Sequence, residues 1–319
     1  MNGRGGSPVV SALWSACREW STAVVRRYLN ASQQNETNLS HSTTSNSPLE
    51  RVEGENFSVA ARLLPAAFRR HLLAVYSFAR LVDDIGDEAI GNRITLLDKV
   101  SQDLDRIYAG QEPWHGSLHD LPATIQTCSI PREPFDALIA ANRQDQVVQR
   151  YSSYDELLAY CELSANPVGH LVLHVFGQFT SARRELSDRI CTALQILEHC
   201  QDVLEDLERG RVYLPQEDLD RFGVAESELK SPPSTTPVRA LLAFETQRAL
   251  RLLDDGAPLI PQLHGWARLA VSGYLAGGLA TAKAIADANY DVLTSTPKPA
   301  KTATLSQWTR LLVTAGGPR

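Results

Sequence analysis

Apolar residues recur at helical spacing from about Glu53 to the C-terminal end of the chain. They fall at positions i, i+3, i+4 and i+7, and no run alternates with a period of two between hairpin turns. Proline and glycine cluster between these segments, for example at residues 111–116 and 231–234. This pattern is typical of amphipathic helices joined by loops. We therefore expect a large helical bundle in which strands are nearly absent.

Composition narrows the class of protein further. The 319 residues carry a formal net charge of −6, which argues against nucleic-acid binding, and the five cysteines lack CxxC spacing. The best candidate for a membrane span, residues 267–285, is interrupted by Arg268, Lys283 and glycines, so we expect no spanning helix. No glycine-rich dinucleotide fingerprint follows a strand. These features predict a cytoplasmic protein that binds no nucleic acid.

The first fifty residues differ from the rest. Residues 30–47 are almost entirely Ser, Thr, Asn and Gln, which provide too little apolar surface to offset their conformational entropy. Apolar residues at roughly helical spacing precede this tract: Val10, Leu13, Trp14, Cys17, Val24 and Tyr28. We expect residues 1–50 to be an extension with a short helix and a disordered linker, and residues 51–319 to form one all-α domain.

A first acidic cluster ends the expected helix over residues 68–88. Asp83 and Asp87 are four residues apart, so one helical turn places both carboxylates on the same face, and Asp84 and Glu88 lie beside them. Like charges at this spacing destabilise an isolated helix by a few tenths of a kcal/mol. A bound cation would remove that cost; the alternative is an ordinary solvated acidic helix end.

A second acidic cluster follows more than a hundred residues later. Glu198, Asp202 and Asp206 fall at i, i+4 and i+8 among apolar neighbours, which predicts an acidic stripe along one helix. Oxygen-only ligands suit Mg²⁺, which keeps several waters and accepts phosphate oxygens from a substrate. Two such helices facing each other would hold a diphosphate between them through Mg²⁺ ions.

Arginines come directly after the second cluster, in Arg209-Gly210-Arg211. Their donors could bind the outer oxygens of a metal-bound diphosphate. They could equally balance the dipole at the end of a helix that Gly210 terminates. The segment Arg143-Gln144-Asp145 leaves the same choice open, between a structural ion pair and contact with the diphosphate.

Two further features have simpler interpretations. His170 and His174 are four residues apart, as a zinc-binding pair would be, but no acidic residue lies between them, and we expect core or pocket histidines. The remaining candidates are cysteines on apolar helix faces, which we expect to be buried small hydrophobes rather than nucleophiles: Cys161, Cys191 and Cys200.

The ordered set of motifs resembles the squalene/phytoene synthase family. The resemblance runs from about residue 55 to residue 293 and includes the Asp83–Asp87 cluster after Tyr76 and Arg80, the Asp202–Asp206 cluster, and then Gly-Arg-Val-Tyr-Leu-Pro at residues 210–215. It implies an all-α isoprenoid synthase fold, a single helical bundle around a central apolar cavity. Residues 51–319 would then be the catalytic domain.

Within that family the chain is most similar to the bacterial hydroxysqualene synthase branch. Relatives that make phytoene or presqualene diphosphate usually carry Asn and Arg where this chain has Glu198 and Gln201, and Ala-Gly where it has Asn166-Pro167. Their C-terminal active-site tyrosine is replaced by glycine near Gly278. These departures favour a later step over the condensation of two farnesyl diphosphates.

The resemblance implies Mg²⁺-dependent conversion of presqualene diphosphate and water to hydroxysqualene and diphosphate. The alternative within the family is a head-to-head prenyltransferase acting on farnesyl or geranylgeranyl diphosphate; a remote alternative is a non-catalytic helical interaction protein. Metal ligands are expected at Asp83, Asp84, Asp87, Glu198, Asp202 and Asp206, of which Asp84 is either a ligand or a partner of one.

Further roles follow from the same resemblance. Asn166 and Gln201 would orient the attacking water, and so join Asp83, Asp87, Asp202 and Asp206 as catalytic residues. Aromatic and apolar groups would shield and stabilise a carbocation, and the candidates are Phe57, Tyr76, Phe78, Tyr160 and Val168. Base rates alone would assign Phe57, Phe78 and Tyr160 to the core. The expected substrate-binding residues are Phe57, Tyr76, Arg80, Tyr160, Gln195, Arg211 and Tyr213.

The apolar substrate that the resemblance implies also suggests contact with a membrane. We expect peripheral contact at the inner face of the membrane through the C-terminal stretch from Leu305 through Trp308 to Leu312, whose apolar residues fall on one face. The alternative, a helix packed on its own domain, is at least as well supported. Association with other enzymes of squalene synthesis is a further expectation.

Overall fold

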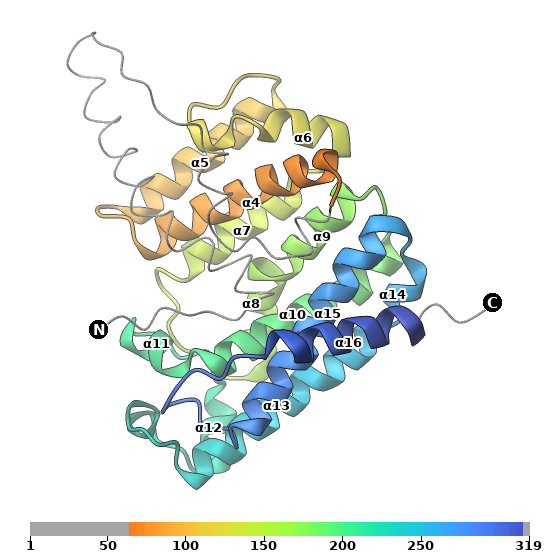
Figure 1. Ribbon diagram of the computed structural model, residues 1–319. Coiled ribbons are helices and arrows are strands. Elements are labelled where there is room, and N and C mark those ends of the chain that lie inside the picture. Colours follow the sequence, from red (N-terminus) through yellow and green to blue (C-terminus); the bar gives the residue numbers. More distant parts are fainter. Residues whose placement is uncertain (1–63, 315–319) are drawn as a thin grey trace, which may run out of the picture.

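The computed structural model describes residues 64–314, which fold almost entirely into helices (Figure 1). This part of the chain contains one isolated parallel bridge, between Arg150 and Val212, and no extended strand. The prediction of an all-α fold is confirmed. The expected extension over residues 1–50 and the candidate Phe57 lie outside the described residues. In chain order the α-helices are α4 (Ala66–Asp87), α5 (Arg93–Tyr108), α6 (Leu121–Cys128), α7 (Glu133–Gln144), α8 (Tyr154–Ser164), α9 (Asn166–Val175), α10 (Ser181–Gln201), α11 (Val203–Glu208), α12 (Gln216–Phe222), α13 (Thr236–Gly256), α14 (Leu259–Gln262), α15 (Gly265–Asp287) and α16 (Lys301–Thr314), with short 3₁₀ helices at Gly116–Leu118 and Glu226–Lys230.

The core consists of two buried apolar clusters that meet beside α9 and α10. One gathers side chains from α8, α10, α13 and α15, and the other from α4, α5, α7 and α9. Phe68 and Leu72 of α4 pack against both clusters. Phe78 is fully buried, with its ring edge against Phe135 of α7 at 4.8 Å between centroids, so it belongs to the core. The central apolar cavity between the helices stays a prediction.

Helix α4 confirms the expected helix over residues 68–88 to within two residues. Its inward face is apolar, with Val75, Val82 and Ile85 buried, and it has no basic residue in its last turn. That last turn instead carries Asp84 and Asp87. Negative charge at the C-terminal end of a helix opposes the helix dipole, which adds to the repulsion between the carboxylates. The end of α4 is therefore stable only if other elements compensate this charge.

The second acidic cluster does not lie on one continuous helix, so that prediction was wrong. Helix α10 ends at Gln201, Asp202 leaves helical geometry with φ −101° and ψ 18°, and a separate short helix, α11, follows. The break has an electrostatic benefit, because Glu205 and Asp206 now lie in the first turn of α11, where the helix dipole favours negative charge. Gly210, with φ +85°, then turns the chain so that Arg211 points back toward α4.

The C-terminal helices pack on each other. The α15 helix is long and apolar enough to cross a membrane by length and composition, but 67% of its most apolar window is buried inside the protein. Trp308 of α16 donates its indole N–H to the Leu269 carbonyl at 3.1 Å and the Ser272 hydroxyl at 2.9 Å, both on α15. Leu311 of α16 packs against the core. The structure therefore favours the alternative in which α16 packs on its own domain.

The two histidines of the zinc-like pair have protein partners. His170 Nε2 lies 2.6 Å from the Asp188 carboxylate on α10, and the His174 ring stacks on Phe179 with 4.3 Å between centroids. Cys161 and Cys200 are buried and unpaired in disulfides, as expected of small hydrophobes. These features form part of the scaffold rather than a second site.

Replacing Trp308 with Ala should destabilise the domain by about 2 kcal/mol, because the ring loses its packing and two hydrogen bonds. Urea unfolding measures this change. Leu305→Ala on the same helix is the matched control: its side chain is 56% exposed, so stability should change by less than about 0.5 kcal/mol. If Trp308→Ala left stability unchanged but abolished flotation with liposomes, α16 would be a membrane anchor instead.

Candidate functional site

The acidic end of α4 is held by polar groups from α7. Asn142 donates its side-chain amide to Asp83 Oδ1 at 3.0 Å and to the Leu138 carbonyl at 3.3 Å. This contact needs a glycine at position 86, because a Cβ there would lie only 2.0 Å from Asn142 Oδ1. One turn earlier Arg80 pairs with Asp84 at 2.6 Å, and both side chains are buried.

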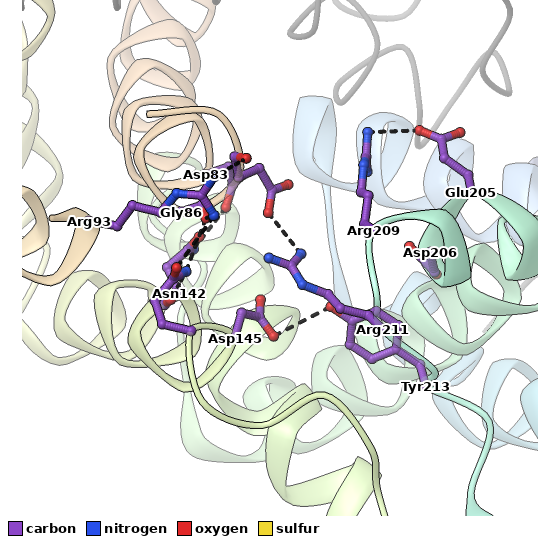
Figure 2. A network of polar contacts seen from close by, with 12 residues as sticks. Asp83, Gly86, Arg93, Asn142, Asp145, Glu205, Asp206, Arg209, Arg211 and Tyr213 are labelled. Carbon is purple, nitrogen blue, oxygen red and sulfur yellow. Dashed lines mark hydrogen bonds and ion pairs between the residues drawn. The ribbon is translucent and has the colours of Figure 1, made fainter. Parts of the chain in front are cut away.

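The last carbonyls of α4 are capped by Arg93 and Gln146. Arg93 donates to the carbonyls of Gly86 and Asp87, each at 2.9 Å, and Gln146 Nε2 donates to the Gly86 carbonyl at 3.0 Å. A guanidinium at the end of a helix satisfies orphan carbonyls and opposes the negative pole of the dipole. These contacts fix the last turn of α4 against the loop after α7 (Figure 2).

Arg211 connects the two acidic segments. Its Nη1 lies 2.8 Å from Asp87 Oδ1, although the two residues are 124 positions apart in the sequence. Figure 2 shows Asp83 on one side of the Arg211 guanidinium and Asp206 on the other. The segments therefore face each other, as the proposed diphosphate site requires. Of the two arginines after the second cluster, Arg211 faces the site and Arg209 pairs with Glu205 at 2.9 Å.

Asp145 and two tyrosines form the floor below Arg211. Tyr160 donates its hydroxyl to Asp145 Oδ2 at 2.9 Å, and Tyr213 donates to Oδ1 at 3.4 Å. Burial raises the pKa of Asp145 to about 6, although Arg211 and the Tyr160 hydroxyl lower it. Arg143, two residues earlier, instead pairs with Asp98 of α5 at 2.6 Å. Arg143 thus forms a structural ion pair, and contact of residues 143–145 with a diphosphate stays a prediction.

His199 joins this floor to the second acidic segment. Its ring stacks on Tyr213 with 3.8 Å between centroids and an angle of 10°. Its Nε2 lies 3.2 Å from Gln195 Nε2, which can only donate, so His199 Nε2 accepts and the ring proton sits on Nδ1. That nitrogen lies 3.7 Å from Asp206 Oδ2. His199 thus lies between the Tyr213 ring, on which it stacks, and the Asp206 carboxylate.

Burial makes the carboxylates of α4 costly to ionise. It raises the pKa of Asp83 well above its ordinary value, even though the Asn142 amide lowers it, and it raises the pKa of Asp84 to about 7 against the effect of Arg80. A doubly charged cation beside these groups would favour their ionised forms.

The residues present fit Mg²⁺ in the chemistry of their donors, since both acidic segments offer only carboxylate oxygens. Between residues 64 and 314, no three His, Cys, Asp or Glu side chains are already close enough to hold one ion. Mg²⁺ commonly takes only one or two protein carboxylates and completes its shell with water and phosphate oxygens. Glu198 and Asp202, both partly buried, lie at the end of α10 with Asp206 just beyond.

The other expected site residues lie at different depths. Asn166 is buried at the start of α9, where its Oδ1 accepts from the Thr192 hydroxyl of α10 at 3.0 Å. Gln201 is buried too, and its amide donates to the Pro297 carbonyl before α16. Neither hydrogen bond joins the Arg211 network. Tyr76 lies partly buried on α4, two turns before Asp83.

Sequence reasoning missed Asn142 and His199 as site residues and left Asp145 undecided. All three lie within or beside segments that it had singled out, namely residues 143–145 and the second acidic cluster. Nothing in their spacing distinguishes them, because each acts through a contact with another helix.

The all-α fold, together with the two facing acidic segments, identifies this protein as one with the isoprenoid synthase fold. The squalene/phytoene synthase family model matches residues 51–309. The chain belongs to the squalene/phytoene synthase family, whose members act on prenyl diphosphates.

Named relatives within the family carry out different steps. Phytoene synthase of Mycobacterium tuberculosis is 33% identical over 222 residues, which cover 67% of this chain and 72% of that protein. Hydroxysqualene synthase of Rhodopseudomonas palustris is also 33% identical, over 210 residues covering 66% and 71%. These identities establish the family but do not separate one reaction from the other.

Solved structures agree with the fold. Squalene synthase HpnC from Alicyclobacillus acidocaldarius matches with a TM-score of 0.70 and 40% identity, covering 74% of this chain and 89% of that one. A dehydrosqualene synthase in complex with a ligand matches with a TM-score of 0.73 at 22% identity, covering 80% and 90%. The second likeness concerns the fold alone.

Replacing Gly86 with Ala should lower activity by at least about tenfold, because the new methyl group displaces the Asn142 amide from Asp83 and misplaces a candidate ligand. Steady-state turnover of a prenyl diphosphate measures the loss. Gly273→Ala in α15 is the matched control, since its Cβ would meet Trp308 at an ordinary 3.7 Å. Equal activities for the two variants would show that the Asn142–Asp83 contact does not matter.

The raised pKa of Asp145 predicts a pH-dependent contribution to stability. A carboxyl whose pKa is about 6 in the folded protein and about 3.9 unfolded stabilises the fold fully below pH 4, and this contribution is lost as the pH rises to 6 and beyond. Relative to Asp145→Asn, the wild-type protein should therefore lose about 2 kcal/mol of stability between pH 4 and pH 7. Urea unfolding across this range measures the difference. Parallel curves for wild type and Asp145→Asn would contradict the assignment.

Proposed function

We propose that this protein converts presqualene diphosphate and water to hydroxysqualene and diphosphate, with Mg²⁺ held between the two acidic segments. The observation that carries the proposal is the Arg211–Asp87 ion pair, which brings the end of α4 and the segment after α11 to one place. A site with carboxylates on both sides and an arginine between them suits a metal-bound diphosphate.

Four departures from the condensing synthases support this step over the prenyltransferase reaction. Glu198, Gln201 and Asn166 stand where those enzymes usually carry Asn, Arg and Ala. Near Gly278, where they carry a tyrosine, an added Cβ would lie 2.7 Å from Leu194 Cδ2, so a side chain there would require Leu194 to move. The 40% identity to squalene synthase HpnC adds support.

The acidic residues and Arg211 would have different roles in binding the diphosphate. Asp83, Asp87, Glu198, Asp202 and Asp206 would hold the ions, with Asp84 paired to Arg80 behind them. Bound Mg²⁺ would supply Lewis-acid stabilisation of charge on the departing diphosphate. Arg211 would donate to the outer diphosphate oxygens, which it can reach with two parallel N–H bonds.

The carbon–oxygen bond to the diphosphate breaks, the carbocation rearranges, and a new carbon–oxygen bond forms to water, whose proton leaves with the diphosphate. Tyr160 and Tyr213 present aromatic rings beside the site, and ring faces stabilise a nearby cation. Asn166 and Gln201 would orient the water, using amide groups that the Thr192 hydroxyl and the Pro297 carbonyl hold in place.

A head-to-head prenyltransferase is the second candidate, because phytoene synthase of Mycobacterium tuberculosis is as similar as the hydroxysqualene synthases. A cytoplasmic location, peripheral contact with the inner face of a membrane, and association with other enzymes of squalene synthesis stay predictions.

Purified protein incubated with Mg²⁺ and presqualene diphosphate should yield hydroxysqualene by mass spectrometry, and EDTA should stop the reaction. Farnesyl diphosphate supplied alone should remain unconsumed. Asp202→Asn should lower the rate by at least about a hundredfold, since a carboxylate that would hold Mg²⁺ beside the departing diphosphate is lost, whereas the surface variant Asp98→Asn should not. Consumption of farnesyl diphosphate would instead establish the transferase reaction, and an unchanged rate in Asp202→Asn would exclude this site.

A further inference from the structure

We propose that Arg211 is a resident counter-cation that occupies the acidic site until a diphosphate arrives, so that Mg²⁺ and diphosphate bind as a coupled pair. The inference rests on the proposed function, because it concerns the same site, but it assigns to one side chain the regulation of metal binding.

The position of Arg211 is the first support. Its guanidinium lies between the acidic segments, 2.8 Å from Asp87, and its side chain is only 13% exposed while that of Asp87 is 35% exposed. The two neighbouring arginines have other partners: Arg80 forms a buried pair with Asp84, and Arg209 pairs with Glu205.

The charge of Arg211 is the second support. An arginine guanidinium stays protonated in proteins, so this group is a fixed positive charge. Asp145 lies below the guanidinium and Asp87 beside it. Part of the negative charge that a metal ion would neutralise is therefore already neutralised.

Two consequences follow for binding. Mg²⁺ arriving alone must compete with Arg211 for Asp87 and meets the repulsion of a fixed positive charge, so its affinity is low. A diphosphate offers Arg211 a better partner, since a guanidinium pairs with phosphate oxygens through two parallel hydrogen bonds. Movement of Arg211 to the diphosphate frees Asp87 for the ion, and by linkage each ligand then strengthens the binding of the other.

The test measures Mg²⁺ binding without any diphosphate, by titration calorimetry. Arg211→Gln should bind Mg²⁺ at least about fivefold more tightly than the wild-type protein, which is the low end of typical coupling between sites. Arg209→Gln is the matched control: it removes the same charge two residues away, from an exposed pair with Glu205, and should stay within about twofold of wild type.

A second titration uses inorganic diphosphate at saturating Mg²⁺. Arg211→Gln should bind it about tenfold more weakly than wild type, so that one substitution moves the two affinities in opposite directions. If circular dichroism shows that Arg211→Gln is not folded, Arg211→Met replaces it, because methionine keeps part of the aliphatic stem.

The outcomes separate the inference from the proposed function. The role of Arg211 would be overturned if Arg211→Gln or Arg211→Met bound Mg²⁺ no more tightly than the wild type. If the wild type still bound magnesium diphosphate normally, the proposed site itself would stand. A wild-type protein that binds no Mg²⁺ even with diphosphate present would overturn both. If Arg209→Gln also bound Mg²⁺ more tightly than the wild type, the change would be an effect of net charge, and this result would overturn the role of Arg211 as well.

Discussion

Negative charge at the C-terminal end of α4 is the constraint on which the rest of the site depends. Asp83, Asp84 and Asp87 repel one another, oppose the helix dipole and lie partly out of water, three effects of the same sign. The surrounding elements compensate this charge in turn: α4 itself through Arg80, α7 through Asn142, and the segment after α11 through Arg211. Much of the tertiary structure around the site therefore follows from one unfavourable helix end.

The second acidic segment has a different local solution. By breaking the helix at Asp202, the chain moves Glu205 and Asp206 to the first turn of α11, where the dipole favours them. One segment is thus held by contacts from other elements and the other by its own backbone. Arg211 is the residue that both share, because it follows α11 in sequence and pairs with α4 in space.

Helical periodicity was enough to predict the fold class and the extent of α4, since the apolar face of a long helix leaves a strong pattern. The two acidic motifs and Arg211 were also visible, because carboxylates on an apolar helix contradict ordinary patterning. The break at Asp202 was not predicted, because i, i+4 spacing fits a continuous helix equally well. Asn142 and His199 were missed since their roles depend on contacts with α4, Tyr213 and Asp206, and such contacts leave no local signal.

The most direct test of the central claim is a diffraction experiment on crystals grown with Mn²⁺ in place of Mg²⁺ and a non-hydrolysable prenyl diphosphate analogue. The account predicts anomalous peaks between the end of α4 and the α10–α11 junction, within coordination distance of carboxylates from both segments, with the Arg211 guanidinium on the diphosphate and no longer on Asp87. Anomalous density elsewhere, or a diphosphate bound away from these carboxylates, would contradict it.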